Sequence, residues 1–241
     1  MKFAIYLFAL SVLAPWAPTP QTIDQSPEVI AARKARDRGS VEELQKAIAK
    51  LKGEADQKKS LAAYLQLALF NVWLCEAAED NQNDVVSKDA AESGVAAAEK
   101  AVAIDPQSSE AHQLLGDLLS QLIPHVYGGG MKYGKRATDE MDRALELNPK
   151  NVDAYVSRAI SYYYTPQSFG GNKAKALEML KKAVEINSAE DSPHIWLATF
   201  YLEDGKQEDA LREINLARST NADRAFTKFV YEMVTSSKKP N

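Results

Sequence analysis

Residues 109–149 read SEAHQLLGDLLSQLIPHVYGGGMKYGKRATDEMDRALELNP, and residues 152–188 read VDAYVSRAISYYYTPQSFGGNKAKALEMLKKAVEINS. Each stretch contains a helical run, a Pro-x-x-aromatic-Gly-Gly segment, a second helical run and an Ala-aliphatic-Glu-aliphatic-Asn ending. Repetition with a period of 20–50 residues is typical of a solenoid, in which each helical hairpin needs its neighbours to bury its apolar face. The duplication therefore predicts an all-α fold of stacked helical hairpins.

The spacing of the endings extends this pattern along the chain. A similar ending, AVAIDP, occupies residues 101–106, and Ala183 and Ala217 are 34 residues apart. The longer spacings upstream place their extra residues between the two helices of a hairpin, where the Pro-x-x-aromatic-Gly-Gly segments lie.

These residues resemble the tetratricopeptide repeat (TPR), a 34-residue helix–turn–helix with the pattern W-x₂-L-G-x₂-Y, A-x₃-F and P. The last unit matches best, at His194, Leu197, Ala198, Tyr201, Ala210 and Ile214. The resemblance covers residues 61–222 and implies a right-handed helical-hairpin solenoid of about four repeats. One departure is Arg158, which occupies a slot that is usually apolar and must either reach water or pair with a charge.

The chain divides into four parts on this interpretation. Residues 1–20 are the signal peptide, and residues 21–59 are an N-terminal helical segment with two helices. Residues 60–220 are the TPR-like solenoid. Residues 221–241 form a C-terminal capping helix and tail, because Phe226, Phe229, Val230 and Met233 recur on one stripe that closes the last open face.

The N-terminus predicts export. Lys2 precedes an apolar run at residues 3–14, which has the length of a signal-peptide core and is too short to span a bilayer. The expected location is periplasmic or extracellular, with no stable membrane span after processing. An uncleaved N-terminal anchor is the alternative. The single cysteine, Cys75, gives no disulfide framework and is interpreted as a core residue.

Charge argues against nucleic acid as a partner. The formal net charge is -4, and residues 61–130 hold 2 basic and 10 acidic residues, for a net of -8. Nucleic-acid binding requires a basic stripe that displaces counterions. A basic cluster on the first helix (Arg33, Lys34, Arg36, Arg38) is interpreted as a solvated face, with contact to an acidic surface as the alternative.

No catalytic, metal or cofactor site is expected. Residues 129–135, GGMKYGK, fit the spacing of a phosphate loop, but Arg136 stands where Ser or Thr would hold magnesium, and no strand precedes them. His112 and His194 share one repeat slot and are interpreted as packing residues, and His125 has no metal-ligating neighbours. We therefore expect that the protein is not an enzyme.

The resemblance implies that the first helix of each hairpin lines a concave groove, which binds a protein or peptide of unspecified identity. Within the third unit we expect Tyr162 in the core and Tyr163 in the groove. Two alternatives stay open: a periplasmic binder of small apolar ligands or transporter-associated subunit, and a purely structural adaptor. The expected groove residues are Gln113, Asp117, Gln121, Val156, Ile160, Tyr163, Tyr164, Ile195 and Thr199.

The glycines of the two Pro-x-x-aromatic-Gly-Gly segments are expected to hold backbone that other residues cannot adopt or approach. Their aromatic residues, Tyr127 and Phe169, are expected to fold back as anchors against the hairpins. The alternative is that these segments form a binding edge, since loops carry function more often than the elements they connect.

Overall fold

The computed structural model describes residues 26–236. The predicted signal peptide, residues 1–20, and the last five residues lie outside this part of the chain. The described residues form helices and no strand. The helices are α1 (Pro27–Asp37), α2 (Val41–Lys58), α3 (Leu61–Asp80), α4 (Asp84–Ile104), α5 (Ser109–Leu122), α6 (Gly129–Leu147), α7 (Val152–Tyr164), the 3-10 helix η1 (Gln167–Phe169), α8 (Lys173–Ile186), α9 (Asp191–Glu203), α10 (Gln207–Thr220) and α11 (Ala225–Ser236).

Short polar side chains fix where many of these helices begin. A Ser or Asn at the N-cap accepts a hydrogen bond from a backbone N–H of the first turn, which satisfies a donor that the helix itself leaves unpaired. This cap starts α1, α3, α4, α5, α7 and α8, through Ser26, Ser60, Asn83, Ser108, Asn151 and Asn172.

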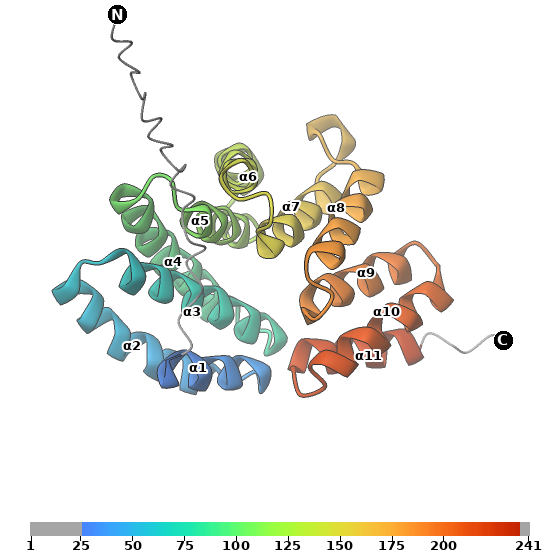
Figure 1. The fold of residues 1–241 in the computed structure, drawn as a ribbon, viewed down its shortest axis with the longest axis horizontal. Helices are drawn as coiled ribbons and strands as arrows, with labels where there is room; N and C mark the ends of the chain where they lie inside the picture. The colour runs from blue at the N-terminus through green and yellow to red at the C-terminus, as the bar shows by residue number, and fades with distance from the viewer. Residues whose placement is uncertain (1–25, 237–241) are drawn as a thin grey trace, which may run out of the picture.

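The helices pair as antiparallel hairpins that stack in chain order (Figure 1). The hairpins are α1–α2, α3–α4, α5–α6, α7–α8 and α9–α10, and α11 packs on the last of them. The fold is therefore the expected all-α solenoid. The N-terminal segment, predicted only as two helices, adds a hairpin of its own to the stack.

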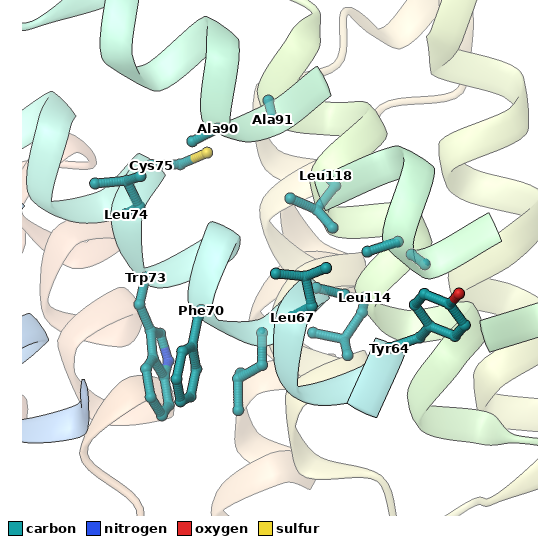
Figure 2. Packing of buried hydrophobic residues seen from close by; sticks show 14 of the residues in the cluster. Tyr64, Leu67, Phe70, Trp73, Leu74, Cys75, Ala90, Ala91, Leu114 and Leu118 are labelled. Atoms are coloured by element: carbon teal, nitrogen blue, oxygen red, sulfur yellow. The ribbon is translucent and has the colours of Figure 1, made fainter. Parts of the chain in front are cut away.

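The apolar helix α3 lies at the centre of the N-terminal core. Figure 2 shows Cys75 facing Ala90 of α4, and Leu67 facing Leu114 of α5. Phe70 and Trp73 stack on the remaining side with ring centroids 5.4 Å apart. By length and composition α3 could cross a membrane, but most of it is buried within the protein, as in the core helix of a solenoid.

The two Pro-x-x-aromatic-Gly-Gly segments use their glycines in the same way. Gly128 and Gly170 have positive φ, at 68° and 94°. A Cβ on Gly171 would lie 1.7 Å from the carbonyl oxygen of Thr165, and one on Gly129 would lie 2.3 Å from that of Ile123. Each segment thus needs one glycine for its backbone angle and the next for a close backbone approach.

The prediction that the aromatic residues of these segments fold back as anchors is wrong. Tyr127 is fully exposed, and Phe169 is 78% exposed. A left-handed glycine follows the aromatic residue in each segment, and backbone hydrogen bonds hold the turn, so the exposed rings contribute little to the chain reversal.

Candidate functional site

The first helices of the hairpins form a closed ring of contacts. Helix α1 packs against α3, α3 against α5, α5 against α7, α7 against α9, α9 against α11, and α11 returns to α1. Figure 1 shows the resulting arrangement, in which α1 and α11, at opposite ends of the described chain, lie next to one another. The concave face of the solenoid is therefore the inner wall of a ring.

Arg224, in the turn between α10 and α11, joins the ends of the ring. Its guanidinium donates two hydrogen bonds to the Glu76 carboxylate on α3, at 2.9 and 2.8 Å, and one to Asp191 Oδ1 on α9, at 3.0 Å. The Arg224 side chain is only 7% exposed. Burial alone favours loss of its proton, but the two carboxylates hold the pKa of Arg224 above its usual value.

The ring surrounds a partly open cavity of about 1580 Å³. Its wall includes inner-face residues of α1, α3, α5, α7 and α9 and the turn that carries Arg224, and it extends along α6 and the two Pro-x-x-aromatic-Gly-Gly segments. Both apolar and charged side chains line it. Aromatic rings gather on one side, where Trp196 lies 6.5 Å from Tyr164 and 5.4 Å from Phe226, measured between ring centroids.

Six carboxylates of the cavity wall form no ion pair with any residue of the described chain. Burial raises the pKa of Asp117 and of Glu79 to about 7, and that of Asp80 to about 6. Burial also raises the pKa of Asp153 and of Glu190. Water reaches Glu79, Asp80, Asp153 and Glu190, but protein lies on several sides of each, because all four line the cavity. We call these residues the inner carboxylates: Glu79, Asp80, Glu110, Asp117, Asp153 and Glu190.

Solved structures of similar fold include a TPR protein and a haemophore. The chain is similar to TTC0263, a thermophilic TPR protein of Thermus thermophilus, with 16% identity, 87% of this chain and 99% of that chain covered, and a TM-score of 0.61. It is also similar to the HusA haemophore of Porphyromonas gingivalis, with 21% identity, 90% and 96% of the two chains covered, and a TM-score of 0.51. No protein-family model matches the sequence, and no curated protein matches it.

The chain has the TPR fold.

Six of the nine expected groove residues line the cavity of this TPR solenoid. Those on α5 are Gln113, Asp117 and Gln121, and those on α7 are Val156, Ile160 and Tyr164. Gln113 donates a 2.5 Å hydrogen bond to Asp117, so the two polar groups of α5 are held together. The repeat geometry of the family thus identifies which side of α5 and of α7 faces the cavity. Binding by these residues stays a prediction.

The placement of Tyr163 in the groove is wrong. Tyr163 is 4% exposed, and its ring stacks on Phe200 with centroids 3.7 Å apart. Its hydroxyl donates to Asp204 at 3.0 Å. The groove stripe continues from Ile160 to Tyr164, and Tyr163, rotated by about 100°, points into the contact between α7 and α9. Tyr162, expected in the core, is only half-buried, under the Arg158 guanidinium.

Ile195 and Thr199 of α9 are also buried and do not line the cavity. Helix α11 packs against α9, and the cluster that contains Ile195 also contains Val230 of α11. The groove face of α9 is displaced to Ser192 and Trp196. The repeat register alone misplaces this helix because a capping helix, and not a full hairpin, follows it.

The sequence alone does not identify the aromatic residues of the cavity wall or the residue that closes the ring. Trp73 lies on a helix that is apolar on nearly every side, so periodicity does not identify its groove face. Trp196 was masked by the register error on α9. Arg224 is a single basic residue in a turn, and its partner Glu76 lies 148 positions away in the sequence. The basic cluster on the first helix was a usable signal, since Arg33 and Arg36 face the cavity.

The histidines have structural partners. His112 Nδ1 lies 2.5 Å from Glu140 Oε2, and His194 Nδ1 lies 2.8 Å from Glu213 Oε2, in equivalent hairpins. The described residues contain no group of three or more metal-ligating side chains. Residues 129–135, which fit the phosphate-loop spacing, are the first turns of α6. Arg158, which occupies a usually apolar slot of the repeat, forms an ion pair with Asp142, with 2.6 Å between Nε and Oδ1.

Proposed function

We propose that this protein binds a peptide segment of a partner protein inside the cavity of its TPR ring. The observation that carries the proposal is the cavity itself, whose volume of about 1580 Å³ exceeds the 300–1,000 Å³ typical of small-molecule sites. A side chain of a bound segment would meet both polar and aromatic groups of the wall. The TPR fold supports a role as a protein-interaction scaffold in general.

The packing of the ring favours binding without large rearrangement. The inner helices are held by the hairpins behind them, so the wall side chains are ordered before a ligand arrives, and little conformational entropy is lost on binding. We further propose that this binding takes place outside the cytoplasm, which rests on the sequence of residues 1–20.

A second candidate ligand is a small apolar molecule. The observation that favours it is the aromatic cluster of Tyr164, Trp196 and Phe226 on one side of the cavity. HusA, which shares the fold, is a haemophore. The charge of the cavity opposes this candidate, because the six inner carboxylates also line it.

A site-specific photo-crosslinker tests the two candidates. Benzoylphenylalanine replaces Ile160, which lines the cavity, or Leu216, which is exposed on α10 and serves as the control. After irradiation in cells of the native host, mass spectrometry maps the linked positions. We expect the Ile160 variant to link to one contiguous segment of a partner protein and the Leu216 variant to give no such product. Equal labelling by both variants, or a small molecule linked at Ile160, contradicts the proposal.

A further inference from the structure

The charges of the cavity wall are unbalanced. Five basic residues line the cavity, but three of them already hold carboxylates: Arg36 pairs with Asp37, Lys135 with Asp139, and Arg224 with its two partners. Within the described chain Arg33 and Lys150 are the lining cations outside any ion pair, and Arg36 and Arg224 act on Asp153 and its neighbours only from a distance. The ring therefore concentrates negative charge on its inner wall.

Asp191 supplies an independent sign that the cavity wall has room for a further hydrogen-bond donor. Its side chain is 9% exposed and lines the cavity. Oδ1 accepts the hydrogen bond from Arg224, but Oδ2 is buried without a partner. A buried carboxylate oxygen that accepts no hydrogen bond is costly, and an ammonium or guanidinium group is the donor that best compensates for it.

The aromatic wall lies next to this acidic region. Trp196 follows Asp191 by five residues on α9, and Phe226 follows Arg224 by two. Aromatic faces attract cations and also accommodate the aliphatic stems of Lys and Arg side chains. The two kinds of wall together suit a segment that carries both positive charge and apolar groups.

On the basis of the proposed function, we infer that the peptide bound in this cavity is basic. Its Lys or Arg side chains meet the inner carboxylates and Asp191 Oδ2, and an adjacent aromatic or aliphatic side chain packs on Tyr164, Trp196 and Phe226. An acidic segment is excluded, because each carboxylate that it introduced would face carboxylates already short of cationic partners. Burial raises the pKa of Asp117 and of Asp153, and a bound cation favours the charged form of both carboxyls.

Selection from a random dodecapeptide library tests this inference with the full chain as bait. The retained peptides are sequenced, and the tightest is labelled and measured by fluorescence anisotropy. We expect the retained peptides to be enriched in Lys and Arg and depleted in Asp and Glu. We also expect replacement of the basic residues of the tightest peptide by Gln to weaken binding at least tenfold.

Two charge variants locate the effect. Asp117→Asn with Asp153→Asn removes two inner carboxylates, and Asp209→Asn with Asp223→Asn removes two carboxylates outside the cavity. We expect the first pair to weaken the basic peptide at least tenfold and the second pair to change its affinity less than twofold. Thermal melting confirms that both variants fold.

The outcomes separate this inference from the proposed function. Tight peptides without basic enrichment, or equal losses in the two charge variants, overturn the inference and leave peptide binding in place. A library that yields no retained peptide contradicts the proposed function, and the inference fails with it.

Discussion

Replacement of Arg224 by Met removes the charge that joins the two ends of the ring while keeping a long apolar stem. Glu76 and Asp191 are then left in the protein without their cation. Breaking a buried ion pair from one side costs about 3–5 kcal/mol. The Glu76 side chain is 20% exposed and recovers part of its hydration, so we expect a loss of about 3 kcal/mol. For a chain of this size, that loss lowers the melting temperature by about 6–12 °C.

Thermal unfolding followed by circular dichroism measures the shift. Lys135→Met is the control, because it also removes one cation of an ion pair, but Lys135 is 85% exposed and its pair with Asp139 contributes little. Adding Glu76→Gln to Arg224→Met restores part of the stability, since one uncompensated charge is removed with it. If Arg224→Met melts within 2 °C of the Lys135→Met control, Arg224 does not hold the ring closed.

Four further changes test separate parts of the account by thermal or urea unfolding. Gly171→Ala forces a Cβ to within 1.7 Å of a carbonyl oxygen and should lower the free energy of unfolding by about 2–3 kcal/mol. Gly134→Ala, in a helix with open space around this position, should raise it by up to about 1 kcal/mol. A change of the same sign in both variants would show that the close backbone approach at Gly171 does not require glycine. Tyr163→Ala should lower the free energy of unfolding by about 3–5 kcal/mol, because the ring is buried against α9. A loss below about 1 kcal/mol would indicate that the Tyr163 side chain faces the groove and not the core. Asp117→Asn should stabilise the protein by about 1–2 kcal/mol at pH 8 and have no effect at pH 4. The Asp117 carboxyl keeps its proton in the folded protein up to its raised pKa of about 7, whereas the unfolded chain releases this proton near pH 4. The free energy of unfolding of the wild-type protein therefore falls as the pH rises between these two values. A constant difference across this pH range would show that Asp117 is not perturbed by burial.

Local sequence patterns predicted the hairpins because the two helices of a hairpin are neighbours in the sequence. The repeated endings and the Pro-x-x-aromatic-Gly-Gly segments mark helix ends and turns, which depend on residues close in the sequence. The roles of Gly128 and Gly170 follow from this, since only a turn with positive φ requires a glycine at that point.

The candidate site was predictable only where neighbouring repeats are alike. Helices α5 and α7 are each followed by a complete hairpin, and their groove residues were placed correctly except at Tyr163. Counted from Ile160, a helical stripe can continue at the third residue, Tyr163, or at the fourth, Tyr164. Repeat spacing does not decide which of these two tyrosines faces the cavity. The error at Ile195 arises because α11 replaces a repeat.

Closure of the ring could not be predicted from local patterns. It depends on the accumulated curvature of the stacked hairpins, which brings α1 against α11. Only this closure makes the ion pairs of Arg224 and turns an open groove into a cavity that concentrates charge. The acidic bias of residues 61–130 was visible in the sequence, but its position on the inner wall was not.

Paramagnetic broadening of methyl NMR signals tests most directly whether the peptide lies inside the ring. A basic dodecapeptide from the library selection carries a nitroxide at its centre and is added to the full chain. We predict that the methyl signals of Val156 and Ile160, which line the cavity, broaden beyond detection, while those of Ile104 and Leu216, exposed outside the cavity, are unchanged. Broadening at Ile104 or Leu216 with Val156 and Ile160 unaffected would place the peptide on the outer surface and contradict the account.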